Sequence, residues 1–297
     1  MKIALTGSSG MIGLHMKALL KQREITCVEV NRSRWDLAHY KTPEQLDEVF
    51  GSVGAVCHFG AFVPPSASDP NAEKIQTGNL FDANVRSCLA LAEWATLRKI
   101  PVVFLSGSTV YKDPHLSSIK EGDEKVVCGF GGFYGFSKWL AENVFEHYRA
   151  QGLQLVTLRP SSVYGTFMPT NRLVANFLQT VSENKTITVV EPVVNKINLV
   201  HAADIALASL TALQQKAWGI YNIGGPSCVT IQQIAQQCVA AAGQGTIEVV
   251  DNKTGVEPFN RYNLCCDRAF AAFGYQPKVG LSQGIAAMAS NSLLTLD

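Results

Sequence analysis

The sequence predicts an α/β protein in which a doubly wound parallel sheet is followed by a smaller, mixed α/β carboxy-terminal domain. The first observation is an alternation of short, mostly apolar runs with helical patterns over the first 165 residues. Strands that are covered on both faces read as such apolar runs, and their alternation with helices indicates βαβ units. The second observation is a looser rhythm beyond residue 165, which indicates a separate region built from shorter elements.

The expected elements follow from this pattern in chain order. In the first half, the strands are KIALTG, TCVEV, AVCHFG, PVVFLS and LQLVTLRP, and the helices cover residues 11–21, 43–50, 84–97 and 134–149. Later we expect a helix at 173–181, a strand TITVVE, a strand–helix–strand unit from INLV to YNIGG that returns to the sheet, and helices at 231–242 and 281–294. The main domain then comprises residues 1–165 and 197–225, and the second domain residues 166–196 and 226–297.

Composition excludes several classes of partner. Of the 297 residues, 47% are hydrophobic, and 25 basic side chains balance 24 acidic ones. No net field attracts nucleic acid or an anionic membrane surface. Glycines interrupt the first apolar stretch before it reaches the length of a signal peptide or a membrane span. We therefore expect a cytoplasmic globular protein. Because the eight cysteines show no metal-ligand spacing, we also expect no bound metal.

A glycine-rich turn follows the first expected strand. In IALTGSSGMIG, Gly7, Gly10 and Gly13 lie between that strand and the first helix. Glycine lets the backbone approach a pyrophosphate, and a helix N-terminus offers free amides and the positive end of the helix dipole. Spaced glycines with a strand before them and a helix after them predict a dinucleotide-binding site.

The end of the second expected strand bears on the choice of cofactor. An acidic residue at this place usually binds the adenosine ribose, whereas an arginine accommodates a 2′-phosphate. TCVEV is followed by Asn31 and Arg32, while Glu29 lies within the strand. This pattern favours NADP over NAD. Asp36 and Leu37 follow at a place suited to bordering the adenine.

A tyrosine and a lysine lie four residues apart at the start of an expected helix. In YGFSK, Tyr134 and Lys138 therefore share one helix face. A tyrosine that works as acid and base near neutral pH needs its pKa lowered from about 10 to about 7, which costs roughly 4 kcal/mol. One ammonium about 4 Å away supplies about that much at an effective dielectric constant of ~20. The pair is therefore sufficient, in magnitude, for proton transfer to and from a substrate hydroxyl.

Taken together, the motifs resemble those of a known family. TGSSGMIG, HFGA, NVRSCLALAEWA, STVY, YGFSK, LRPSSVYG, INLVHAADIA and YNIGG occur in the order found in extended short-chain dehydrogenases/reductases of the NAD(P)-dependent sugar-nucleotide epimerase/dehydratase group. The resemblance implies a Rossmann-type cofactor domain and a smaller substrate domain. It also implies that Tyr134 and Lys138 form the catalytic pair, that the substrate is a nucleotide sugar, and that two copies form a homodimer.

The motifs and the resemblance together define the expected contact residues. Those expected to bind the cofactor are Gly7, Ser9, Gly10, Met11, Ile12, Gly13, Asn31, Arg32, Asp36, Leu37, Phe59, Gly60, Ala61, Asn84, Tyr134, Lys138, Pro160 and Ser161. Those expected to bind the substrate are Ser108, Thr109, Ser162, Lys196 and Arg261. Many relatives have an arginine at the position of Lys196, and a lysine lacks the bidentate fork that suits a pyrophosphate.

In the resembled family, a further hydroxyl normally shares the substrate oxygen with the catalytic tyrosine. It belongs to a serine or threonine four residues before the tyrosine of the VY motif, and this chain has Gly107 at that position. Ser106 and Ser108 flank the glycine. We expect Ser108 to be the catalytic substitute, with Ser106 behind it.

The same loop bears on the type of reaction. The 4,6-dehydratases of the resembled family carry an Asp-Glu pair where this chain has Ser108 and Thr109, and the 3,5-epimerase/reductases carry a cysteine at the second of these positions. We therefore expect a 4-epimerase or a 4-ketoreductase. Two alternatives stay open: an NADP-dependent reductase of a small non-nucleotide carbonyl, and an NADP-binding sensor without catalysis. Gly107 argues for the sensor, and the retained Tyr134 and Lys138 argue against it.

Overall fold

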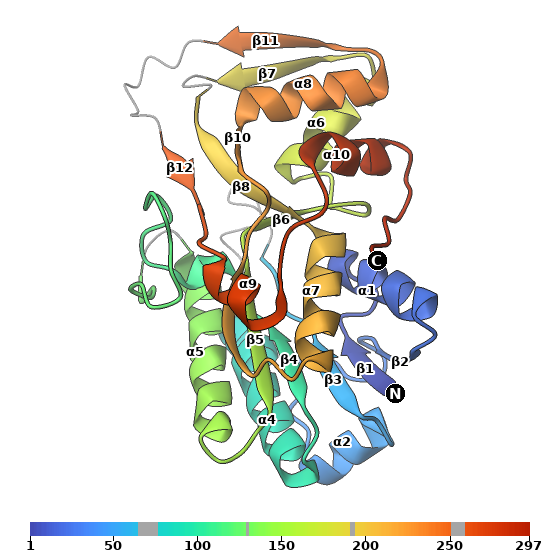
Figure 1. Ribbon diagram of the computed structural model, residues 1–297, viewed down its shortest axis with the longest axis vertical. Coiled ribbons are helices and arrows are strands. Elements are labelled where there is room, and N and C mark those ends of the chain that lie inside the picture. Colours follow the sequence, from blue (N-terminus) through green and yellow to red (C-terminus); the bar gives the residue numbers. More distant parts are fainter. Residues whose placement is uncertain (65–76, 129–130, 191–193, 251–258) are drawn as a thin grey trace.

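The computed structural model describes residues 1–64, 77–128, 131–190, 194–250 and 259–297. The described residues form a six-stranded, all-parallel sheet in the order β2-β1-β3-β4-β5-β9 (Figure 1). Its strands are β1 (Lys2–Thr6), β2 (Thr26–Val30), β3 (Ala55–His58), β4 (Val102–Leu105), β5 (Leu155–Pro160) and β9 (Gly219–Ile223). The strand order reverses between β1 and β3, and ligands of doubly wound sheets bind outside the carboxyl ends of the strands at such a point.

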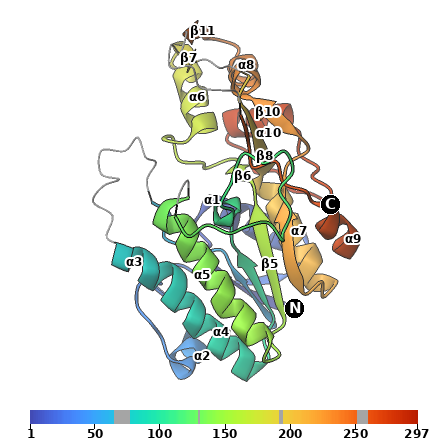
Figure 2. The ribbon, with the colours of Figure 1, turned by 90° about the vertical axis from the view of Figure 1, so that its left-hand side faces the viewer.

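Helices cover both faces of this sheet because successive strand residues point to opposite sides. Ile3 and Leu5 of β1 pack in a core with α1 (Met11–Gln22), α7 (Ala202–Gln214) and α9 (Asp267–Phe273). Ala4 belongs to the opposite core, formed with α2 (Pro43–Phe50), α4 (Ser87–Arg98) and α5 (Gly132–Arg149). Figure 2 shows α4 and α5 side by side on this second face. The doubly wound prediction is confirmed.

A smaller region lies beyond the carboxyl ends of the large sheet (Figure 1). Within the described residues it contains a sheet of β6 (Ser162–Tyr164), β8 (Lys196–His201), β10 (Cys228–Thr230) and β12 (Asn260–Arg261), and a parallel pair, β7 (Thr186–Val190) and β11 (Thr246–Val250). The helices α6 (Leu173–Ser182), α8 (Ile231–Ala242) and α10 (Leu281–Ala289) pack with these strands around a core of their own.

Three elements differ from the sequence-based expectation. The strand of INLV does not return to the large sheet: β5 pairs with β9 on its outer edge, so β8 pairs with β6 instead. The expected helix at 84–97 is preceded by α3 (Thr77–Phe81) and begins as a π-helical turn, Asp82–Arg86, before α4. The last helix ends at Ala289 rather than at residue 294. Among the described residues, no helix is long and apolar enough to cross a membrane.

Candidate active site

The glycine turn after β1 forms a close backbone contact with the turn after β3. Gly7 has φ +68°, and a Cβ there would lie 2.7 Å from the Gly60 nitrogen, while a Cβ on Gly13 would lie 2.1 Å from the Gly7 oxygen. Gly10 caps α1 without a side-chain hydrogen bond, and the first turn of α1 carries no acidic residue. The helix N-terminus is therefore open to an anion, and the turn fits the pyrophosphate of a dinucleotide.

A buried relay holds the two turns together. The Thr6 hydroxyl accepts a hydrogen bond from the Gly60 N–H at 3.1 Å and lies 2.8 Å from Nδ1 of His58. Nε2 of His58 lies 3.6 Å from the Cys88 sulfur. Burial lowers the pKa of His58 to about 3, and the nearby Lys138 charge acts in the same direction. His58 is thus a neutral core histidine.

The turn after β2 is organised by its own side chains. The Asn31 carboxamide oxygen accepts from the Ser33 hydroxyl at 2.7 Å and from the Arg34 N–H at 3.2 Å. Glu29, the acidic residue of this strand, is held by Lys17 at 2.7 Å. Arg32 is exposed. At the end of β2, Arg32 is therefore exposed to solvent, while the Glu29 carboxylate is paired with Lys17.

Leu37 contacts the turn after β3, whereas Asp36 makes a contact only within its own turn. A Cβ on Gly60 would come within 2.9 Å of Leu37 Cδ1, so Leu37 borders the turn after β3. The Asp36 carboxylate accepts from the Ala38 N–H at 3.1 Å. The structure therefore places Leu37 beside the turn after β3 and gives Asp36 a local turn contact, and their expected place beside the adenine stays a prediction.

Lys138 and Tyr134 both lie in the first turns of α5. The Lys138 ammonium is buried, donates to the Leu105 oxygen at 2.7 Å, and lies 4.7 Å from the centre of the Phe104 ring. Burial lowers the pKa of Lys138 to about 8. Burial also raises the pKa of Tyr134 to about 12, and the cation that opposes this rise is Arg172. Arg172, whose charge opposes that rise, is not part of the sequence motifs.

Asn84 connects the cofactor side of the site to the helix that carries Tyr134. Its side chain accepts from the Phe62 N–H at 2.7 Å and donates to the Phe62 oxygen at 3.0 Å. The same amide donates to the Ser137 hydroxyl at 3.2 Å, which in turn donates to the backbone carbonyl oxygen of Tyr134 at 2.7 Å. Asn84 lies in the π-helical turn, and such turns often occur at functional sites.

The serine-rich turn after β4 places its hydroxyls in different surroundings. The Ser106 hydroxyl donates to the buried carboxylate of Glu142, which also binds Arg159 at 2.5 Å. Ser106 therefore belongs to a buried ion-pair network. Ser108 is buried and opens a short 3₁₀ turn, Ser108–Val110. Gly107 has an extended backbone, so its conformation does not require glycine.

Gly131, which caps the start of α5, and Gly135 in its first turns bring the Ser108–Val110 turn close to Tyr134. A Cβ on Gly131 would lie 2.6 Å from the backbone carbonyl oxygen of Thr109, and a Cβ on Gly135 would lie 2.3 Å from the same atom. Only glycine therefore fits on either side of the tyrosine at this distance. The sequence contains the signal as GGFYG, but the motif alone does not name the residue that approaches it.

The expected substrate residues come from neighbouring strands. In the pairing of β8 with β12, Lys196 lies opposite Asn260, and Arg261 lies opposite Ile197. The Arg261 guanidinium lies 5.0 Å from the centre of the Phe259 ring. Ser162 begins β6, after Pro160 and Ser161 at the end of β5. The structure thus places Lys196 and Arg261 on adjacent strands but one register step apart, so that their side chains point to opposite faces of this sheet.

Sequence reasoning missed two residues near Tyr134. Arg172 precedes α6 and donates to the Pro64 oxygen at 3.1 Å. Tyr262 follows Arg261, is buried, and has φ +56°, which is uncommon for a tyrosine. Burial raises the pKa of Tyr262, the Arg261 charge opposes this rise, and the nearby Tyr134 adds to it. Neither residue belongs to a recognisable motif, because only the folding of the second region brings them to the site.

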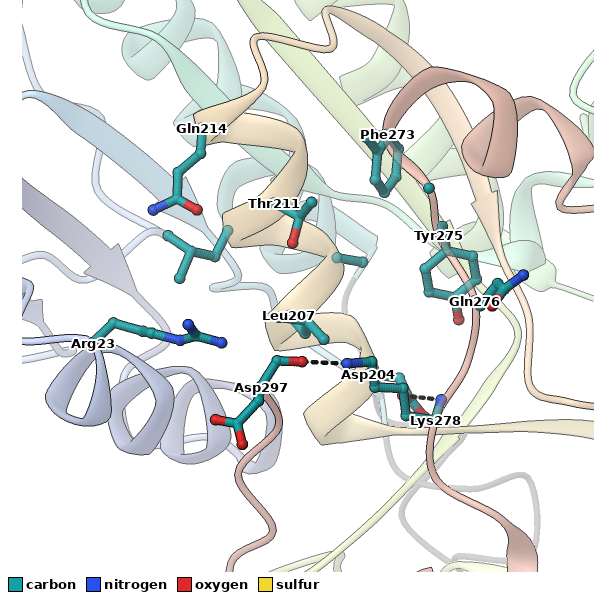
Figure 3. A pocket seen from close by; sticks show the side chains of 13 residues that line it. Arg23, Asp204, Leu207, Thr211, Gln214, Phe273, Tyr275, Gln276, Lys278 and Asp297 are labelled. Carbon is teal, nitrogen blue, oxygen red and sulfur yellow. Dashed lines mark hydrogen bonds between the residues drawn. The ribbon is translucent and has the colours of Figure 1, made fainter.

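A separate pocket of about 370 Å³ lies along α7, away from the predicted site residues. Figure 3 shows Asp204 of α7, Tyr275, Lys278 and Asp297 around it. The Asp204 carboxylate accepts from the Lys278 N–H at 2.7 Å, and burial raises its pKa to about 6. No group of three His, Cys, Asp or Glu side chains that could hold a metal occurs among the described residues.

Comparison with known proteins finds relatives and similar solved structures over most of the chain. UDP-glucuronic acid decarboxylase 6 of Arabidopsis thaliana is 26% identical over an alignment that covers 100% of this chain and 90% of that protein. The dTDP-glucose 4,6-dehydratase of Streptomyces niveus is 25% identical over 81% of this chain and 70% of its own length. The solved UDP-glucose 4-epimerase of Thermus thermophilus, in complex with NAD, matches with a TM-score of 0.79 at 23% identity, over 98% of each chain.

A family model gives the same result over most of the chain. The model of the NAD dependent epimerase/dehydratase family matches residues 3–224, from β1 to the end of the large sheet. This range contains the glycine turn, Asn84, Tyr134 and Lys138. The chain belongs to the NAD-dependent epimerase/dehydratase family.

Proposed function

We propose that this chain acts on a nucleotide sugar by hydride transfer at C4, as a 4-epimerase or a 4-ketoreductase rather than a 4,6-dehydratase. The observation that carries the proposal is the close packing of the Ser108–Val110 turn against the Tyr134 turn of α5. The residues of that turn are neutral, so it offers no carboxylic acid to remove water from the sugar. Glu142, the carboxylate beneath it, is engaged by Arg159 and Ser106.

The roles of the chain's own groups follow from their surroundings. Tyr134 accepts the proton of the C4 hydroxyl in one direction and returns it in the other. Arg172 favours the anionic form of that tyrosine, which burial disfavours. The Lys138 ammonium, fixed on the Leu105 oxygen, is placed to bind the hydroxyls of a ribose. A bound nicotinamide supplies the carbon that takes up and returns the hydride.

A nucleotide sugar is supported by the relatives and by one cation of the second region. The half-buried Arg261 guanidinium lies beside the Phe259 ring, and a guanidinium suits the diphosphate of such a substrate, whereas Lys196, one register step away, points to the opposite face of the sheet. The relatives reported above act on UDP- or dTDP-linked sugars, according to their names.

NADP is the cofactor that we propose from the turn after β2. Arg32 is exposed there, and Glu29 is occupied by Lys17. A solved relative binds NAD, so NAD is the competing choice. The test compares the Kd values of the two cofactors for the natural chain and for Arg32→Glu. We expect Arg32→Glu to weaken NADP binding by about tenfold or more, because it removes one charge contact and adds a repulsive one. Equal binding of NADP by both would contradict the proposal.

A homodimer is also part of the proposal. Leu89 and Leu97 of α4 are exposed, eight residues apart and therefore on one helix face. These two exposed leucines support pairing with a second copy through this face. Sedimentation of the natural chain and of Leu97→Glu would test this: the substitution should yield monomers.

The proposed reaction is tested with Tyr134→Phe. UDP-glucose, UDP-glucuronic acid and dTDP-glucose are supplied with each cofactor, and the sugar products are separated and identified. With the oxidised cofactors we expect from the natural chain either a sugar inverted at C4 or, for a 4-ketoreductase working in reverse, a 4-keto sugar with an equal amount of reduced cofactor, and turnover at least about a hundredfold lower for Tyr134→Phe. Tyr148→Phe, a change of the same kind on α5, is the control that should retain activity. A 4-keto-6-deoxy product would show a dehydratase, and undiminished turnover of Tyr134→Phe would refute the proposed mechanism.

A further inference from the structure

There is free space at Gly107, the position at which relatives in the family normally have a serine or threonine hydroxyl. A Cβ at Gly107 would have the Thr109 hydroxyl oxygen as its nearest neighbour outside the adjoining residues, at an ordinary contact distance of 3.5 Å. The Gly107 backbone is extended, which any residue can adopt. Neither space nor conformation therefore requires a glycine here. The question is which neighbouring group occupies the role.

Ser106 is engaged in another contact. Its hydroxyl donates to Glu142, whose carboxylate receives further hydrogen bonds from Arg159 at 2.5, 2.9 and 3.2 Å. To reach a substrate, Ser106 would have to leave a buried carboxylate short of a donor, which is unfavourable. The ion-pair network thus keeps this hydroxyl in the core.

The Thr109 hydroxyl has the opposite character. It is buried and makes no hydrogen bond to any residue in the described part of the chain. Buried hydroxyls are nearly always hydrogen-bonded, so the Thr109 hydroxyl is free to bond a water or a ligand that enters the site, a state that it shares with the hydroxyls of Ser8, Thr157 and Ser161. The open space at Gly107 is 3.5 Å away, measured to the position of the absent Cβ. An oxygen that entered this space would lie within reach of the Thr109 hydroxyl.

Thr109 is also fixed relative to the catalytic tyrosine. Its carbonyl oxygen lies against Gly131, the N-cap of α5, and Gly135, which follows Tyr134, and its Cβ would lie 3.4 Å from a Cβ on Gly135. Thr109 therefore lies between the Gly107 space and the turn that carries Tyr134. A rigid contact of this kind holds a donor in place before the substrate binds.

We infer that Thr109 is the catalytic hydroxyl of this chain: it donates a hydrogen bond to the same substrate oxygen that exchanges its proton with Tyr134. The inference rests on the proposed function, and it deepens it by naming the second group on the reacting oxygen. Gly107 then makes room for that oxygen to reach a donor two residues further along. The hydroxyl expected at Ser108 is the competing assignment.

The first test compares single substitutions in the intact protein. Thr109→Val keeps the shape of the side chain and removes the hydroxyl; we expect kcat/KM to fall by about 10²–10³, as for other lost donors to a reacting oxygen. Thr109→Ser should retain activity within about tenfold. Thr96→Val on α4 is the matched control that should leave activity unchanged. Melting temperatures of all variants separate loss of the donor from loss of the fold.

The second test is a rescue. A serine at position 107 fits the open space. The double variant Gly107→Ser/Thr109→Val should therefore have a kcat/KM at least about tenfold higher than that of Thr109→Val alone. Rescue of this kind would not follow if Thr109 were only structural. Restoration in the double variant and loss in the single variant together support the assignment.

The outcomes separate this inference from the proposed function. Full activity of Thr109→Val, or a larger loss for Ser108→Ala than for Thr109→Val, overturns the assignment while Tyr134→Phe still reports on the reaction. A folded Thr109→Val variant that loses activity and is not rescued by Gly107→Ser also overturns it. If the natural chain acts on no nucleotide sugar, the proposed function fails and this inference fails with it.

Discussion

Glu142 lies one helical turn after Lys138 on α5, yet its carboxylate pairs with Arg159 at 2.5 Å rather than with that ammonium. Both partners are almost completely buried. Arg159 also donates to the Tyr111 hydroxyl at 3.1 Å and to the Glu121 oxygen at 2.9 Å. Because Arg159 engages the carboxylate, the Lys138 ammonium keeps no acidic partner among the described residues and remains available to a ligand.

Removing Arg159 should therefore cost stability. Arg159→Met leaves the Glu142 carboxylate buried without its partner, and we expect a loss of about 3–5 kcal/mol in the free energy of unfolding. Adding Glu142→Gln removes the unpaired charge and should recover part of that loss. Urea unfolding of the natural chain and both variants measures these values; a double variant as unstable as Arg159→Met would contradict the account.

Arg172 should set the pH dependence of turnover. Its charge lowers the pKa of Tyr134 against the effect of burial, so Arg172→Gln should move the tyrosine-dependent limb of the kcat profile to higher pH by roughly 0.5–1 pH unit. Arg172→Lys keeps the charge and should shift it less. Arg149→Gln, near the end of α5, is the control. An unchanged profile for Arg172→Gln would show that this charge does not act on the tyrosine.

Gly135→Ala should separate α5 from the turn that it touches. The new Cβ would lie 2.3 Å from the backbone carbonyl oxygen of Thr109, so either α5 or the Ser108–Val110 turn must move. We expect a loss of about 1–3 kcal/mol in stability and a much larger fractional loss of turnover. Gly122→Ala has no neighbour within 4 Å and is the matched control. Thermal unfolding and initial rates check both effects, and a fully active Gly135→Ala would refute the close contact.

Acid should destabilise the protein partly through His201. Burial lowers the pKa of His201 from 6.5 to about 3, so between these values the unfolded chain binds a proton that the folded chain does not. The stabilisation is complete above pH 6.5 and is lost as pH falls toward 3. His201→Asn keeps an acceptor for the Ala203 N–H.

Between pH 7 and pH 4, the free energy of unfolding should fall for both proteins. We expect the fall to be smaller for His201→Asn than for the natural chain, by roughly 2–3 kcal/mol. Chemical denaturation at both pH values measures this difference. The exposed His147 provides the control, because His147→Asn should leave the acid sensitivity as it is. Equal acid sensitivity of the natural chain and His201→Asn would contradict the prediction.

Local patterns predicted much of the fold. The helix at 43–50 is found with the expected ends because its start signals are local: Thr42 caps it, Gln45 completes the capping box, and Pro43 occupies the first turn. The glycine turn is local in the same sense. Sheet membership is not, and β8 joins β6 because β9, which follows it in the chain, occupies the edge of β5.

The candidate site divides along the same line. The motif of Tyr134 and Lys138 lies within one helix and is visible as spacing. The hydrogen bond of Ser106 to Glu142 joins two segments 36 residues apart, and Arg172 approaches Tyr134 from the second region. Such contacts depend on how segments pack, so sequence spacing alone could not tell which hydroxyl of SGSTVY is free.

The return of the chain to the large sheet has a consequence for its synthesis. β5 ends at Pro160 and its edge partner β9 begins at Gly219, with part of the second region between them. At roughly 5–20 residues per second, a ribosome needs on the order of 3–12 s to make that interval. Throughout it the nascent chain carries an unpaired strand edge, which readily pairs with other chains. Messages truncated before codon 219 should therefore yield aggregates rather than a smaller, working nucleotide-binding unit.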